Sequence, residues 1–189
     1  MEDVWNRIET WLRANAPETL HDLRSGATRD DIRAAEAALG VSFPDDMVAS
    51  YLRHDGQDHI GYALMGQWQL LPLEHLVIQG ESMRDLPPDE EAGEGEDEGA
   101  YANPVRQEWW NPRWVPVAYD GGGDLRCVDL DPTPYGTMGQ VMTFWHTDER
   151  RERLALSFRE WLNGFADDLE QGRYAVQDGE VTEVERSHS

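Results

Sequence analysis

The sequence predicts a single α+β domain in which a mixed, largely antiparallel sheet is packed by N-terminal helices and a C-terminal helix. Apolar residues recur at the helical period near both ends of the chain, and strand-like runs separated by turn residues lie between them. At 189 residues the chain can bury a substantial core, whereas a second full domain would be cramped. We therefore expect one domain.

The N-terminal part is expected to be helical. In "EDVWNRIETWLRANAP" the apolar residues fall on one helical face over residues 3–14, and Pro17 marks the break. The next helix has clearer limits, because Thr28 is suited to the N-cap, Asp31 follows three positions later, and Gly40 is a typical stop.

A third helix is expected between Pro44, which suits a first helical turn, and the Asp55-Gly56 pair. Residues 61–71 resemble one or two short strands, and a further helix should begin near Pro72. Residues 87–100, "PPDEEAGEGEDEGA", hold seven acids and nothing large and apolar, so we expect a solvated, disordered loop.

Three strand-like runs follow, over residues 114–119, 125–130 and 140–146, and the turn clusters between them predict an antiparallel meander. "LSFREWLNGFADDLEQG" then predicts a closing helix that is capped by Ser157, carries an apolar face and ends at Gly172. Beyond Tyr174 the sequence is polar and is expected to fray.

Charge limits the kind of partner. The chain carries 38 acidic residues against 16 basic ones, all of them arginine, for a formal net charge of −22. Such a surplus repels the phosphates of nucleic acids and anionic membrane surfaces, so we predict neither as a direct partner. The same field attracts a basic protein. The natural expectation is a cationic protein partner.

The expected location is the cytoplasm. Cys127 is the lone cysteine, so the chain needs no oxidising compartment. The N-terminus begins with acids and lacks the pattern of a signal peptide, and no apolar run approaches the roughly 18 residues of a membrane-spanning helix.

The stretch "VPVAYDGGGDLRCVDLD" raises the question of a phosphate or metal loop. A phosphate loop needs a lysine and a following helix, and a dinucleotide-binding motif must open a helix; here acids flank the glycines and a strand-like run follows. Asp120, Asp124, Asp129 and Asp131 could bind a hard cation, although the EF-hand spacing is not met. A glycine hairpin with aspartate caps is favoured, and no cofactor or metal is predicted.

No catalytic set emerges from the other reactive residues. No pair of histidines has a zinc-site spacing. His146 with Asp148 could form a base and its orienting carboxylate, but no nucleophile signature accompanies them. Cys127 lies in a strand-like run and is expected to be a small buried hydrophobe. We therefore predict no enzyme.

Tryptophans in "QEWWNPRWVP" offer the clearest lead to a binding surface. Most tryptophans fill cores, but one exposed beside acidic residues would mark a protein-binding patch. The candidate partner-binding residues are Trp109, Trp110, Asp120, Asp124 and Asp148.

Several of these motifs together resemble the SUKH superfamily over about residues 28–170. The first half of the resemblance lies in "TRDDIRAAEAALGVSFPDDMVASYLRHDGQ" and the second in "NPRWVPVAYDGGGDLRCVDLD", followed by "GQV" and "ALSFREWLNGF". The matching positions are Ile32, Glu36, Leu39, Gly40, Phe43, Pro44, Tyr51, Gly56, Trp114, Pro116, Asp120, Gly121, Gly123, Asp129 and Gly139. The resemblance implies an α+β domain over 28–173, preceded by a helical elaboration at 1–27, interrupted by an acidic insertion at 87–100 and followed by a polar tail at 174–189.

The resemblance also implies function. The superfamily includes fungal cell-wall-assembly regulators and many bacterial immunity proteins that neutralise toxins, often nucleases, and it brings no catalytic residues. The favoured prediction is a bacterial immunity protein that binds and occludes a basic toxin domain; the alternative is a regulatory or scaffold protein in cell-wall assembly and growth control. An enzyme would need a pocket joining His146, Asp120 and Asp124 around a metal.

Overall fold

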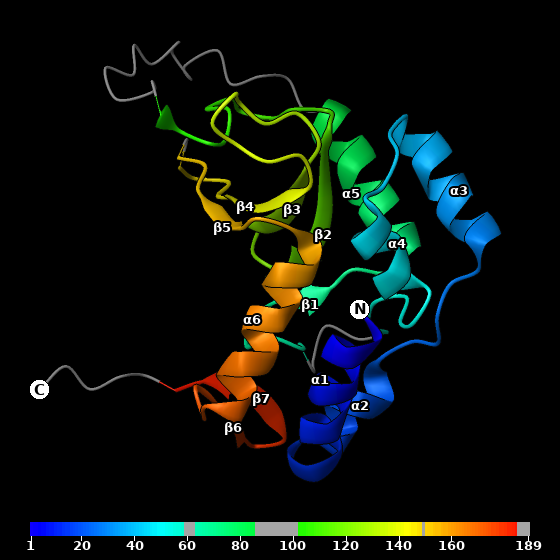
Figure 1. Cartoon of the computed structure of the whole chain (residues 1–189), viewed down its shortest axis with the longest axis vertical. Coiled ribbons are helices and arrows are strands. Elements are labelled where there is room, and N and C mark those ends of the chain that lie inside the picture. The colour runs from blue at the N-terminus through cyan, green and yellow to red at the C-terminus, as the bar shows by residue number, and fades with distance from the viewer. Residues whose placement is uncertain (59–62, 86–101, 149, 185–189) are drawn as a thin grey trace, which may run out of the picture.

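A computed structural model describes residues 1–58, 63–85, 102–148 and 150–184 (Figure 1). The acidic segment predicted at 87–100 lies outside the described residues. In the described parts of the chain, helices precede and follow one antiparallel sheet, and a small hairpin comes last. The helices are α1 (Glu2–Asn15), α2 (Pro17–Asp22), α3 (Arg29–Leu39), α4 (Asp45–Tyr51), α5 (Leu73–Asp85) and α6 (Phe158–Glu170).

The sheet contains five strands in the order β1-β2-β3-β4-β5, and every pair is antiparallel. This confirms the predicted α+β class and the three-stranded meander. One edge strand lies within residues 61–71, where a short strand was expected, and the structure adds a short strand at the other edge. The strands are β1 (Gln69–Leu70), β2 (Trp114–Tyr119), β3 (Leu125–Asp129), β4 (Gln140–Phe144) and β5 (Arg153–Ala155), with β6 (Tyr174–Gln177) and β7 (Glu180–Glu183) forming a separate hairpin.

Local capping explains the limits of α3 and α6. The Thr28 hydroxyl accepts from the Asp31 backbone N–H, and the Asp31 carboxylate accepts from the Thr28 backbone N–H, which completes a capping box. Gly40 ends α3 in the left-handed conformation with φ of 66°. Ser157 caps α6 through the backbone N–H of Glu160. The structure thus confirms the two N-caps and the glycine stop of α3 that the sequence predicted.

Both faces of the sheet are buried. On one face, Val115, Val128 and Val141 join the main core, which also takes the apolar faces of the helices. On the other face, Cys127 and Phe144 belong to a smaller core that is covered in part by the segment before β2. Residues that are adjacent along a strand therefore enter different cores, as the twofold alternation of a strand requires. In Figure 1, α5 lies between α3 and β2, and both contacts are present.

Two elements differ from the sequence prediction. The first helix ends at Asn15, as the break at Pro17 predicts, but Pro17 then begins the additional helix α2, because proline fits the first turn of a helix. Residues 174–183 form the β6–β7 hairpin, so the prediction of a fraying tail is wrong for this part of 174–189. Asp178, at φ of 53°, and Gly179 make its turn, and Val181 is buried against the main core. Across the described parts of the chain, no helix is both long enough and apolar enough to span a bilayer.

Candidate functional site

The triple-glycine stretch is the turn of the β2–β3 hairpin. The Asp120 carboxylate accepts hydrogen bonds from the backbone N–H groups of Gly122, Gly123 and Asp124, at 2.8, 3.1 and 3.0 Å. The carboxylate thus caps three donors of the turn, which is the arrangement that the sequence favoured. The Asp120 carboxylate therefore has a structural role in this turn.

Asp124 holds the neighbouring His146. Its Oδ1 accepts from the backbone N–H of His146 at 3.0 Å and lies 2.8 Å from the ring Nδ1. A side chain at Gly123 would collide with the same ring, because an added Cβ would lie 2.9 Å from it. The place where an enzyme would need a pocket joining His146, Asp120 and Asp124 is therefore a packed turn.

The other two aspartates of the metal interpretation also have protein partners. Asp129 is fully buried and accepts from Gln140 Nε2 and the Asp131 backbone N–H; its burial raises its pKa above the usual range. Asp131 accepts from Arg106 and Asn111. Among the residues that the structure describes, no group of three or more histidine, cysteine or acidic side chains is arranged to hold a metal ion.

The remaining candidates lie around a buried arginine. Asp148 forms an ion pair with Arg150 at 3.1 Å, and its backbone carbonyl accepts from Arg151. The Arg151 guanidinium also donates to the carbonyl of Trp109 at 3.1 Å. The structure thus links Asp148 to Trp109 through Arg151, a residue that the sequence analysis missed because it sits in an ordinary charged run.

Trp109 and Trp110 are half-buried. Their rings pack edge-on against Phe144, at 5.5 and 5.4 Å between ring centres, and belong to the margin of the smaller core. Trp114 is fully buried in that core. Cys127 is buried there too, and burial raises the pKa of its thiol, as expected for an inert residue. The role of Trp109 and Trp110 as partner anchors stays a prediction.

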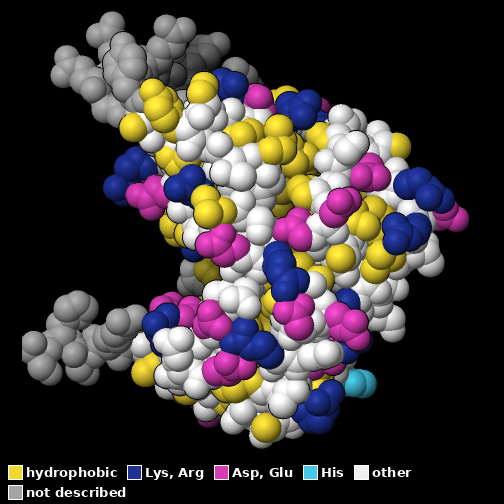
Figure 2. Space-filling view, viewed as in Figure 1, with side chains coloured by type: hydrophobic (Ala, Val, Ile, Leu, Met, Phe, Trp, Pro, Cys, Tyr) yellow, Lys and Arg dark blue, Asp and Glu magenta, His cyan; other side chains and the backbone are white. Residues whose placement is uncertain are grey.

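A second feature of the surface is a cleft away from the β2–β3 turn. It lies between α6, the β6–β7 hairpin, β5 and the turn at residues 65–68, and its volume is about 940 Å³. Figure 2 shows an indentation of the surface on the left, between the sheet and the hairpin. Its walls carry Trp68, Trp161, Phe165 and Tyr174.

Arg126 of β3, a half-buried residue, also lines this cleft. Its guanidinium carbon sits 3.9 Å from the ring centre of Trp68 and 4.9 Å from that of Trp145. Burial lowers the pKa of Arg126, and the carboxylate of Asp124 opposes that effect. Its Nη1 is buried and has no hydrogen-bond partner among the described residues.

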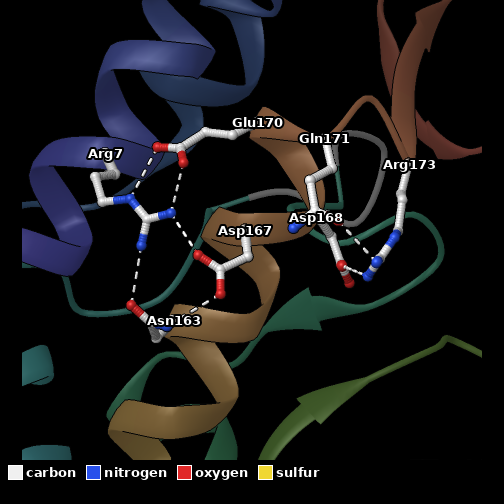
Figure 3. A network of polar contacts seen from close by, with 7 residues as sticks. All are labelled: Arg7, Asn163, Asp167, Asp168, Glu170, Gln171 and Arg173. Atoms are coloured by element: carbon white, nitrogen blue, oxygen red, sulfur yellow. Dashed lines mark hydrogen bonds and ion pairs between the residues drawn. The ribbon is translucent and has the colours of Figure 1, made fainter.

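Acidic side chains surround the rest of the cleft. Glu160, Asp167, Asp168, Glu180 and Glu183 contribute to its lining. Asp167 and Asp168 form ion pairs with two arginines that do not line the cleft, Arg7 and Arg173 (Figure 3). Arg7 of α1 binds Asp167 at 2.5 Å and Glu170 at 2.6 Å, and Arg173 binds Asp168.

The network around Arg7 also fixes the wall of the cleft. Arg7 adds a 2.9 Å hydrogen bond to Asn163, so a single guanidinium holds three positions of α6 against α1. Neither Glu180 nor Glu183 forms an ion pair with a described residue. The cleft therefore has a fixed helical wall and a negatively charged outer margin.

Sequence reasoning did not find this cleft, because its walls come from segments far apart in the chain. One local signal was present. Arg126 is a charged residue between the apolar residues Leu125 and Cys127 of β3, and a charge inside a strand that is largely buried needs partners.

These features define a class of protein: a small α+β domain with an acidic cleft, in which the predicted reactive residues are engaged in structural contacts. The chain belongs to the SMI1/KNR4 family (SUKH-1), whose family model matches residues 26–164. This confirms the resemblance seen in the sequence.

Several proteins with a named role align with most of the length of the chain. It is 26% identical to the cell wall assembly regulator SMI1 of Saccharomyces cerevisiae, over 93% of the chain and 41% of that protein. It is 29% identical to the cell wall biosynthesis/cell cycle regulator smi1 of Schizosaccharomyces pombe, over 94% of the chain and 38% of that protein. A glucan synthesis regulatory protein of Neurospora crassa is 26% identical over 92% of the chain and 39% of that protein. The chain thus spans about two fifths of the length of these relatives.

Proposed function

We propose that the chain is a non-catalytic, cytoplasmic, protein-binding regulator of cell-wall assembly. The observation that carries this proposal is the match over more than nine tenths of the chain to proteins named as regulators of cell-wall assembly, cell-wall biosynthesis and glucan synthesis. These relatives support the regulatory alternative of the sequence analysis better than the immunity interpretation that it favoured.

The geometry supports a binding role. The aspartates and the histidine that a catalytic centre would need are occupied in the β2–β3 turn, where Asp120 caps backbone groups and Asp124 holds His146. The cleft beside α6, in contrast, combines aromatic walls with polar groups, which is a common composition for sites that bind other molecules.

Immunity to a toxin is a second candidate, and a different observation favours it. A net charge of −22 suits the occlusion of a cationic active site, because carboxylates can take the place of the phosphates of a nucleic acid. The toxin would then be basic, and a nuclease is the natural class.

Deletion of the gene in the organism that encodes it separates the two functions. A regulator of wall assembly predicts lysis of the deletion strain in hypo-osmotic medium, corrected by re-expression of the chain. The regulatory proposal fails if the deletion strain keeps normal osmotic resistance. Growth inhibition by co-cultured parent cells, with an intact wall, would establish immunity in its place.

A further inference from the structure

The cleft between α6 and the β6–β7 hairpin has the chemistry of a site for a basic peptide. We propose that it takes an extended segment of a partner protein and holds an arginine or lysine of that segment at the Glu180–Glu183 margin. This inference rests on the proposed function as a protein-binding domain, which it deepens by naming the site and the chemistry of the ligand.

The first argument is charge. Glu180 and Glu183 are exposed on β7, and no described residue forms an ion pair with either. Glu160 adds a third carboxylate on the α6 side, where it accepts only from the backbone N–H of Leu156 among the described contacts. Together with the ion-paired Asp167 and Asp168, five acids line the cleft against one arginine. A cationic side chain is complementary to this margin, and an anionic one is repelled.

The second argument is the aromatic wall. Trp161 is half-buried on α6 and packs edge-on against Phe158, at 5.5 Å between ring centres. Tyr174 of β6 lines the same cleft and packs edge-on against Phe165, at 5.2 Å between ring centres. Aromatic faces attract guanidinium and ammonium groups, and they also cover the apolar stems of arginine and lysine. Burial, helped by the nearby Glu183 and Asp168, raises the pKa of Tyr174 to about 12.

The third argument comes from Arg126, which lines the cleft. Arg126 is fixed between Trp68 and Trp145, and it has unused donor capacity because its Nη1 meets no described acceptor. Peptide carbonyls are the acceptors that an extended segment carries at every residue. A bound segment that places a backbone carbonyl at Arg126 and a basic side chain at Glu183 would supply an acceptor to the first and a counter-charge to the second.

The test is a titration of the full chain with an acetylated, amidated peptide of alternating glycine and arginine. The comparison peptide carries glutamate in place of arginine, and binding is followed by calorimetry at about 50 mM salt. We expect the arginine peptide to bind and the glutamate peptide to show no heat. Binding should weaken as salt approaches 0.5 M, because exposed charges are screened.

Two variants locate the site. Glu180→Gln with Glu183→Gln removes two exposed charges from the margin and should weaken arginine-peptide binding about fivefold. The matched control, Glu18→Gln with Glu81→Gln, removes two exposed charges from helices that do not line the cleft and should leave the affinity within about twofold. Circular dichroism and thermal unfolding verify that both variants fold.

The outcomes are distinct. Equal weakening by both pairs means that net charge alone attracts the peptide and overturns the cleft assignment. No binding of the arginine peptide, or preferential binding of the glutamate peptide, also overturns it. None of these results touches the regulatory proposal, which depends on the osmotic phenotype of the deletion strain.

Discussion

Arg151 shows how a single buried cation can organise a loop. It is fully buried, its guanidinium lies 4.4 Å above the ring of Phe144, and it donates to backbone carbonyls at Trp109, Trp145 and Asp148. These carbonyls belong to the two segments that flank the smaller core. The guanidinium therefore fixes the position of both segments.

Replacing Arg151 with methionine should destabilise the protein. The apolar stem stays, but the buried carbonyls lose their donors, at a cost of about 3 kcal/mol in the free energy of unfolding. Arg151→Lys is the control, because it keeps the charge without the planar fork, and it should recover part of this loss. Urea unfolding measures both. An Arg151→Met variant within about 0.5 kcal/mol of the wild type would contradict this role.

Glu9 is a second residue whose charge matters to stability. It accepts from Arg53 Nε at 2.7 Å and from Arg53 Nη2 at 2.8 Å, and its Oε1 lies 2.9 Å from His54 Nε2. The hydrogen bonds from Arg53 are the main reason that the pKa of Glu9 is lowered. This pair joins α1 to the end of α4.

The lowered pKa predicts a pH dependence. The stabilisation by Glu9 is complete above its unfolded pKa of about 4.3 and is lost as the pH falls through the lower folded pKa. Glu9→Gln should cost about 2 kcal/mol at pH 7, and its deficit against the wild type should shrink toward pH 3. Urea unfolding across this pH range tests the expectation, with Glu18→Gln as the exposed control. A deficit that is the same at pH 7 and pH 3 would refute it.

At the scale of elements, the β2–β3 hairpin depends on a glycine contact. Gly123 has φ of 118°, and a Cβ there would lie 2.9 Å from the His146 ring. Gly121 in the same turn also has a positive φ, at 83°, but nothing lies within 4 Å of its Cβ position. Comparing the same substitution at the two glycines therefore distinguishes the effect of backbone strain from that of a steric collision.

Gly123→Ala should be the more damaging substitution. Gly121→Ala meets only the backbone cost, of about 1 kcal/mol, whereas Gly123→Ala must also displace His146 and should cost about 2 kcal/mol or more. Thermal unfolding of the two variants gives the comparison. Equal losses would show that the His146 ring moves aside freely.

The elements that could be predicted from sequence are those with local signals. The capping residues Thr28 and Ser157 mark the starts of α3 and α6, and strand-like runs separated by turn clusters mark β2, β3 and β4. The strand β5 could not be predicted, because three residues with mostly exposed side chains show no alternation. The Asp178-Gly179 turn was visible in the sequence, but the hairpin around it is held by the burial of Val181, which is a tertiary contact.

The candidate site was less predictable than the fold. The residues predicted to bind a partner are acids and aromatics that the structure places mainly in turns and at the margin of the smaller core. They are Trp109, Trp110, Asp120, Asp124 and Asp148. The cleft depends on how α6, the hairpin and the turn at residues 65–68 pack against one another, and no local sequence pattern predicts contacts between such distant segments.

At the scale of the whole molecule, an acidic body presents one cleft in which aromatic walls and carboxylates converge. Under the proposed function, the net charge of −22 would attract basic partners from a distance, and the cleft would supply short-range contacts that charge alone does not. If the proposed function and the proposed peptide site both hold, the domain regulates wall assembly by binding through this cleft, with no chemical step at His146.

Rescue of the deletion strain by variants tests this central claim most directly. At equal protein levels, the wild-type chain, His146→Gln and the Glu18→Gln/Glu81→Gln control should restore osmotic resistance, and Glu180→Gln/Glu183→Gln should restore it poorly. The survival of each strain after hypo-osmotic shock is the quantity measured. Full rescue by the cleft variant together with loss of rescue by His146→Gln would contradict the account.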